Sequence, residues 1–396
     1  MRINKKILKN GLTIIHEKRD VPVTTVMLAV KYGAANEDEN EKGLAHFIEH
    51  MCFKGTEKRS AKEIAEEVEK LGGDLNAFTS EEITAYHVKL PSEHLGVAMD
   101  VIFDVFFNPI FPNEDFFKEA NVICEEIKMY NDNPRAHVLD EIKCCLYERP
   151  FGMFIGGTEE NVKRFSPKML LDRHRSIYTP SNSILCVVGD NEFNDVVRFA
   201  ERFCIEREGG RILVKNIKNQ NLKKIENRMD IQQANIAIGF HFPKLTDKDR
   251  YAAEIFSTVL GDGMSSKLFT EVREKRGLVY NVKTEMDAGI NYGYLVIFAG
   301  TDKSKIDEVI NICIEEFGKM KEITEKELEQ AKIQAIGGWK VEQEGSSETA
   351  LNLIIEETGG NVKDYYSFEE KIKKVNLEDI KKLADKIDYG SFILSS

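Results

Sequence analysis

Apolar positions follow the helix period in some segments of the chain and run together as in strands in others. From residue 113 to 131 they form one helical stripe, at Phe116, Phe117, Ala120, Ile123 and Ile127. Asn113 stands at the start of this segment and suits a helix N-cap. Residues 24–32 are an apolar run that predicts a strand, and we expect a hairpin turning at Asn10-Gly11 before it.

The same signals outline the rest of the first half. Ser60 and Glu63 are spaced as a capping box, and we expect the helix that they begin to end at Gly72-Gly73. The other expected elements are strands at 74–80, 83–90 and 183–188, and helices at 92–107 and 192–205.

The second half repeats this order of elements. The expected elements are strand material at 223–242, a helix at 247–260, a short helix after a Gly-rich turn, strands near 278–287 and 291–300, helices from 303 and a last strand at 392–394. The repeat predicts an α+β fold of two homologous domains, each a mainly antiparallel sheet packed with helices. We place the first domain at 1–208, a polar linker at 209–222 and the second domain at 223–396.

Composition narrows the classes of partner. The 396 residues are 42% apolar, enough for a large core, and the formal net charge is −12. This charge argues against nucleic acid and anionic membranes and weakly favours basic peptides, although an acidic surface also serves solubility. The first residues lack an apolar stretch long enough for a signal peptide, and no later segment is long enough to span a bilayer. Seven cysteines, mostly in apolar patterns, predict free thiols in a reducing compartment, and we expect the cytoplasm.

The most informative motif is His46-Phe47-Ile48-Glu49-His50. On a helix the two histidines lie on the same face, and Glu49 falls within about a quarter turn of both. Two imidazoles at this spacing suit Zn²⁺, and a carboxylate that is not a ligand can take a proton from a metal-bound water. The order is the reverse of the HExxH helix and is the inverzincin pattern. With 8 histidines in the chain, a chance match to ordinary surface or core residues is the alternative.

A third ligand is expected on the helix at 113–131. Glu119 and Glu126 are two turns apart and share a face to within about 20°. Glu126 could complete a His/His/Glu site with water in the fourth position, and Glu119 would then orient a ligand from behind. The alternative is a solvated acidic face, since Glu125 shows that acids are abundant here.

Three other segments leave alternatives open. The run 74–80 follows two glycines, and it is either an exposed edge strand that can pair with an extended peptide or an internal strand. The turn at 261–267 lacks the spacing of a phosphate-binding loop, and we interpret it as the start of a helix. The Gly-rich turn at 156–161 opens a helix, and the sequence assigns it no role.

Blocks along both halves resemble the pitrilysin-type metallopeptidases, in particular their two-domain branch, which includes the mitochondrial processing peptidase β-subunit and bacterial relatives. The blocks that carry the resemblance are Gly33, GLAHFIEHM at 43–51, KGT at 54–56, GGDLNAFTS at 72–80, EEIKMY at 125–130, LGDGMSSKL at 260–268 and REKRGLVY at 273–280. They stand in the order and spacing of the family.

The resemblance implies roles for several residues. The family's third ligand matches Glu126, and Glu119 matches a residue behind it. The edge strand would lie beside the metal, with Asn76, Ala77 and Phe78 meeting the substrate. Arg273 and Tyr280 match a pair that grips substrate and helps to polarise the scissile carbonyl, as suits a cation and a phenol.

We therefore expect a zinc endopeptidase that acts on peptides or unfolded segments, with one Zn²⁺ per chain held by His46, His50 and Glu126 and with Glu49 as base. The resemblance also implies a clam-like dimer around a closed chamber: a homodimer in which the Arg273/Tyr280 pair comes from the partner, or a heterodimer with a related subunit. The alternative function is a non-catalytic partner subunit or peptide-binding scaffold. Metal storage fits less well, because three protein ligands and an adjacent acid suit catalysis. The sequence does not identify the substrate or the cleavage preference, and it does not distinguish zinc from manganese as the metal in the cell.

Overall fold

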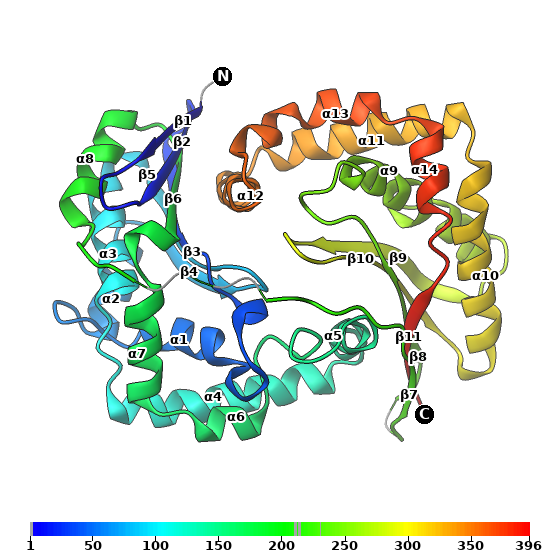
Figure 1. The fold of residues 1–396 in the computed structure, drawn as a ribbon, viewed down its shortest axis with the longest axis horizontal. Coiled ribbons are helices and arrows are strands. Elements are labelled where there is room, and N and C mark those ends of the chain that lie inside the picture. Colours follow the sequence, from blue (N-terminus) through cyan, green and yellow to red (C-terminus); the bar gives the residue numbers. More distant parts are fainter. Residues whose placement is uncertain (1–2, 210–211, 213–214, 230) are drawn as a thin grey trace. The chain divides into compact units, whose positions relative to one another are not determined.

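The computed structural model describes residues 3–209, 212, 215–229 and 231–396, and these residues form two compact units (Figure 1). Unit 1 comprises 1–127, 154–215 and 342–362, and unit 2 comprises the rest of the chain. The expected linker at 209–222 includes four positions outside the described residues. No helix among the described residues is long and apolar enough to cross a bilayer.

Unit 1 contains a six-stranded sheet in the order β1-β2-β6-β3-β5-β4. Its strands are β1 (Ile3–Ile7), β2 (Thr13–Lys18), β3 (Val23–Val30), β4 (Asp74–Thr79), β5 (Thr84–Pro91) and β6 (Ser183–Gly189). Its helices are α1 (Leu44–Cys52), α2 (Ala61–Glu69), α3 (Leu95–Phe107), α4 (Asn113–Asp132, in this unit as far as residue 127), α6 (Glu159–Arg164), α7 (Pro167–Ile177), α8 (Phe193–Phe203) and α12 (Ser346–Thr358).

Helices cover both faces of this sheet. Alternate residues of β3 point to opposite faces. Val26, Leu28 and Val30 are buried in the core that β3 shares with α1 and α3. On the other face, the Thr25 hydroxyl is 2.8 Å from that of Ser346, at the start of α12. The sheet is therefore the middle of three layers.

Unit 2 contains a five-stranded sheet in the order β7-β11-β8-β10-β9. Its strands are β7 (Lys223–Asn227), β8 (Ala234–His241), β9 (Val279–Ala288), β10 (Gly293–Thr301) and β11 (Tyr389–Ser395). Its helices are α5 (Pro134–Leu146), α9 (Arg250–Gly261), the short helix η5 (Phe269–Glu274), α10 (Ile306–Lys319), α11 (Glu325–Glu342), α13 (Phe368–Lys374) and α14 (Leu377–Leu383).

The two sheets have the same topology. From β2 onward, each strand of the first sheet has a counterpart in the second, taken in chain order. In both sheets one pair is parallel, β2 with β6 and β7 with β11, and the other pairs are antiparallel. The expected α+β fold with two mainly antiparallel sheets packed with helices is confirmed.

Each unit includes one helix from the other half of the sequence. Helix α5 packs on β8 and β11 of unit 2, and α12 packs on β3 and β6 of unit 1. A Cβ on Gly239 in β8 would lie 2.6 Å from Leu146 Cδ1 and 3.0 Å from Ile142 Cγ1, so α5 packs closely on this strand. The division of the sequence into domains at 1–208 and 223–396 stays a prediction. Each compact unit contains residues from both of these segments.

The predicted elements lie close to the observed ones. Ser60 accepts a hydrogen bond from the Glu63 amide (3.3 Å) and donates its own amide to the Glu63 carboxylate (2.8 Å), which is the expected capping box of α2. The Asn10-Gly11 turn joins β1 to β2 with Gly11 at φ +90°. The turn at 261–267 leads into a helix, with the Ser266 hydroxyl accepting from the Phe269 amide (3.4 Å).

Candidate metal centre

Helix α1 carries the His/Glu/His motif and is fixed at its start by a buried carboxylate. Gly43, at φ +99°, precedes the helix, and Leu44, Phe47, Ile48 and Met51 bury its other face. The two carboxylate oxygens of Glu37 accept from the amides of Gly43 (2.9 Å) and Ala45 (2.6 Å). These are donors that a helix N-terminus otherwise leaves unsatisfied, and the positive end of the helix dipole favours an anion there.

The Gly-rich turn at 156–161 supports this same helix start. A Cβ on Gly157, which has φ +77°, would lie 2.1 Å from the carbonyl oxygen of Lys42. The Asn161 side-chain amide donates to the carbonyls of Glu39 (2.8 Å) and Lys42 (3.2 Å). The turn therefore holds the segment before α1, a role that the sequence alone did not assign.

The structure brings His46, His50 and Glu126 together. One donor atom from each lies within 4.8 Å of the others. The Glu126 Oε2 oxygen is 3.7 Å from His46 Nε2 and 3.5 Å from His50 Nε2. The side chain of His46 is 15% exposed, that of His50 20% and that of Glu126 26%. The donors are therefore shielded and yet reachable from solvent.

This donor set fits a zinc ion. Zinc bonds of about 2.0–2.1 Å at tetrahedral angles separate two ligand atoms by about 3.3 Å. The two His–Glu distances of 3.7 and 3.5 Å need only small side-chain movements to reach that spacing. Two imidazoles and one carboxylate leave a fourth position for water or substrate, as in catalytic rather than structural zinc sites.

The two histidines differ in their surroundings. Burial, and to a smaller extent the neighbouring His50, lower the pKa of His46 to about 3, so this ring is neutral. Burial also lowers the pKa of His50, but its hydrogen bond to Glu119 and the nearby carboxylates outweigh burial and leave that pKa raised. Of the two histidines, His50 is therefore the one at which protons would compete more strongly with a bound metal ion.

Glu49 lies beside this cluster without belonging to it. Its carboxylate Oε2 accepts a hydrogen bond from the Thr79 hydroxyl on β4 (2.6 Å). Burial raises the pKa of Glu49, while the Thr79 hydrogen bond and His50 oppose that shift. A buried carboxylate with a raised pKa is suited to accept a proton and to release it again.

Glu119 lies on the other side of His50. Its Oε2 oxygen is 3.1 Å from His50 Nδ1, and its Oε1 oxygen is 2.5 Å from the Lys54 ammonium. A proton on Nδ1 leaves the Nε2 lone pair of His50 facing Glu126. By contrast, Nδ1 of His46 is buried and has no hydrogen-bond partner among the described residues.

Strand β4 is at the edge of the first sheet, and among the described residues it pairs with β5 alone. Asn76, Ala77 and Phe78 lie on it, with Asn76 exposed and the other two partly exposed. Thr79, at the end of the strand, contacts Glu49, so this edge ends next to the helix that carries His46 and His50. Of the two alternatives for this segment, the structure has the edge strand.

Arg273 and Tyr280 lie in unit 2, at η5 and the start of β9. The Arg273 guanidinium lies 5.0 Å from the centre of the Tyr280 ring and 4.6 Å from that of Phe269. The Tyr280 side chain is exposed. The structure brings these two residues together with each other, in a different unit from the His/His/Glu cluster.

Sequence reasoning missed Glu37, Lys54 and Thr79. Glu37 supports the start of α1, Lys54 pairs with Glu119, and Thr79 donates to Glu49, and no helix or strand period links these residues. The one available signal was position, because Lys54 and Thr79 fall inside the blocks that carry the family resemblance.

Comparisons with known proteins identify the family of the chain. Residues 12–155 match the family described as Insulinase (Peptidase family M16), and residues 164–335 match the Peptidase M16 inactive domain. The uncharacterized zinc protease YmxG of Bacillus subtilis strain 168 is 32% identical over 99% of this chain and 98% of its own. An uncharacterized zinc protease of Rickettsia bellii strain RML369-C is 32% identical over 86% of this chain and 84% of its own.

A solved structure shares the fold. The crystal structure of a protease from Helicobacter pylori superimposes with a TM-score of 0.92 at 22% identity, over 100% of this chain and 99% of that one. This likeness shows the fold, and the sequence matches show the family. The chain belongs to peptidase family M16.

Proposed function

We propose that this protein is a zinc endopeptidase that hydrolyses peptides or unfolded segments. The observation that carries the proposal is the cluster of His46, His50 and Glu126, whose donors lie within 4.8 Å of one another beside the buried Glu49. An edge strand that ends at this cluster supports peptides as the substrate class.

The chemistry divides between the metal and this chain's residues. Bound zinc supplies Lewis-acid activation of water and of the scissile carbonyl. Glu49 removes a proton from the attacking water while the water oxygen forms a bond to the carbonyl carbon. When the C–N bond breaks, Glu49 passes that proton to the leaving amine. Thr79 keeps the carboxylate in place through its hydrogen bond.

Strand β4 binds the substrate in this proposal. An extended peptide adds to the free edge by main-chain hydrogen bonds, at Asn76, Ala77 and Phe78. Main-chain pairing makes few demands on sequence, which suits varied peptides. The Arg273 guanidinium and the Tyr280 hydroxyl donate hydrogen bonds to the oxyanion that forms at the carbonyl. We place the enzyme in the cytoplasm, and its seven free thiols support a reducing compartment.

A peptide-binding scaffold is the alternative function, because an edge strand and an Arg/Tyr pair can hold a peptide without cleaving it. Binding a peptide without cleaving it does not require a buried carboxylate beside three metal donors. Residues 164–335 match a domain described as inactive, but the donor cluster lies within residues 12–155, which match the Insulinase (Peptidase family M16) model.

Substrate size tests the proposal. We expect the zinc-loaded protein to cleave a reduced and alkylated polypeptide and to leave the same polypeptide intact when it is folded with its disulfides. Exclusion follows if two copies enclose a chamber, because only an extended chain can then reach β4. Mass spectrometry of the products measures both reactions, with a chelator-treated sample as control. Equal cleavage of the native form would refute the chamber, and no cleavage of either form would favour the scaffold.

The pairing of chains has a separate test. We propose a homodimer in which Arg273 and Tyr280 of one copy serve the metal site of the other, although a related subunit could take the partner's place. Mixing an inactive Glu49→Gln chain with an inactive Tyr280→Phe chain then builds one intact site in each mixed dimer. At equal amounts with free exchange, about a quarter of wild-type activity should return.

The matched control is a mixture of Glu49→Gln with His50→Ala. Both lesions lie in the same part of the site, so no combination of these chains is intact, and we expect no activity. If native mass spectrometry shows mixed dimers and the first mixture stays inactive, each site must be built within one chain.

A further inference from the structure

The segment that follows α1 links this helix to Glu119, the carboxylate that contacts His50. Lys54 comes just after α1, and its amide donates to the carbonyl of Met51 (3.1 Å), which fixes its backbone to the helix end. Its ammonium is 2.5 Å from Glu119 Oε1, and the other oxygen of the same carboxylate is 3.1 Å from His50 Nδ1. One carboxylate thus contacts both residues.

A carboxylate held at one oxygen has less freedom to turn at the other. With Oε1 paired to Lys54, Oε2 is the oxygen that faces His50 Nδ1, and it favours the tautomer that carries the proton on this nitrogen. His50 Nε2 is then the atom left to bind a metal. Lys54 also brings a positive charge to a site with three carboxylates, those of Glu49, Glu119 and Glu126.

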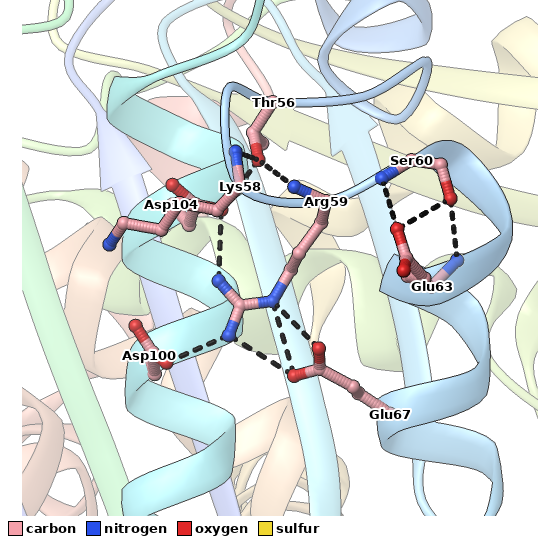
Figure 2. A network of polar contacts seen from close by, with 8 residues as sticks. All are labelled: Thr56, Lys58, Arg59, Ser60, Glu63, Glu67, Asp100 and Asp104. Atoms are coloured by element: carbon pink, nitrogen blue, oxygen red, sulfur yellow. Dashed lines mark hydrogen bonds and ion pairs between the residues drawn. The ribbon is translucent and has the colours of Figure 1, made fainter.

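A network of ion pairs and hydrogen bonds around the Arg59 side chain anchors the rest of this segment (Figure 2). The Arg59 side chain, 9% exposed, donates to the carboxylates of Asp100 (2.7 Å) and Asp104 (2.9 Å) on α3 and to Glu67 on α2 (3.1 Å). The hydroxyl of Thr56 donates to Asp104 (2.6 Å) and accepts from the Arg59 amide (3.0 Å).

The anchored segment is also tied to the approach to α4. The amide of Ile110, in the connection between α3 and α4, donates to the carbonyl of Gly55 (3.1 Å). Helix α4 carries Glu119 and Glu126. The backbone around Lys54 is therefore hydrogen-bonded both to the end of α1 and to the connection that leads into α4.

We propose that Lys54 is a positioning residue of the metal site, which orients Glu119 and through it His50, on a loop that the Arg59 network fixes. The proposal rests on the proposed zinc site. Lys54 touches neither the donor atoms nor a substrate; its effect is on the affinity for the metal ion.

Zinc affinity of the full-length protein, measured by competition with a chromogenic chelator, tests this role. We expect Lys54→Met to bind zinc about 10-fold more weakly, at the lower end of the roughly 10–100-fold losses typical of groups behind a ligand. Lys54→Gln should behave in the same way, and Lys54→Arg should restore most of the affinity, because a guanidinium can still pair with Glu119.

The matched control is Lys267→Met. Lys267 is 2.5 Å from Glu327, and its side chain is 24% exposed against 28% for Lys54, but it lies in unit 2. Its loss removes an equivalent ion pair away from the donor cluster, and we expect wild-type zinc affinity.

A double-mutant cycle separates positioning from a general effect of charge. In a Glu119→Gln background, Lys54→Met should add little to the loss, because Lys54 acts through that carboxylate. Full additivity, or unchanged affinity in Lys54→Met and Lys54→Gln, would overturn the inference while leaving the zinc site intact. If the wild-type protein itself binds no zinc, the proposed function fails first.

Discussion

Replacing Glu49 by Gln should leave zinc bound and lower kcat for peptide hydrolysis by about 10²–10⁴-fold, the range that a positioned general base contributes. The amide has the shape of the carboxylate, and its oxygen can still accept the hydrogen bond from Thr79, which is 2.6 Å long in the wild type. It cannot accept a proton from water. Zinc content by inductively coupled plasma mass spectrometry and peptide cleavage should be measured on the same preparation.

This result separates the base from the ligands, since Glu49 lies outside the donor cluster of His46, His50 and Glu126. The comparison variant is His50→Ala, which keeps Glu49 and removes a donor. If Glu49→Gln lost zinc as readily as His50→Ala, the carboxylate would be a ligand, and the assignment of the base would be wrong.

The second large effect is expected at the ligands themselves. His50→Ala and Glu126→Gln should each weaken zinc binding by more than the roughly 10–100-fold that loss of a supporting group costs, because they remove a coordinating atom. Hydrolysis at limiting zinc should fall with the bound metal. Isothermal titration of the metal-free proteins with zinc measures the loss directly.

Glu125→Gln is the matched control for Glu126→Gln. Glu125 is the next residue on the same helix and is exposed, whereas Glu126 faces the two histidines. The control removes the same charge from the same helix turn, so zinc affinity should stay near that of the wild type. An equal loss in both variants would mean that Glu126 acts through its charge and not as a ligand.

Local sequence patterns account for much of the fold. The capping box at Ser60, the Asn10-Gly11 hairpin and the apolar run that became β3 each depend on neighbouring residues, and each was predictable. The repeat of elements predicted two α+β halves, and the two sheets share one strand order. The sequence did not predict that α5, from the first half, packs in unit 2 or that α12, from the second half, packs in unit 1. This packing depends on tertiary contacts.

The same distinction applies to the site. Helix geometry placed His46 and His50 on one face, and a spacing of two turns placed Glu119 and Glu126 on another; the structure brings these faces together. Thr79, Lys54 and Glu37 escaped prediction, because their contacts depend on how β4, the loop after α1 and the segment before it fold onto the site. No periodicity encodes such contacts.

The central claim is that zinc at this cluster makes the protein a peptidase. The most direct measurement is a zinc titration of the metal-free wild-type protein with hydrolysis of an unstructured peptide library followed at each step, and with manganese in a parallel series. The account predicts no cleavage without metal and activity that rises in proportion to bound zinc, up to one ion per chain. Binding of one zinc per chain with no cleavage of any peptide would contradict it.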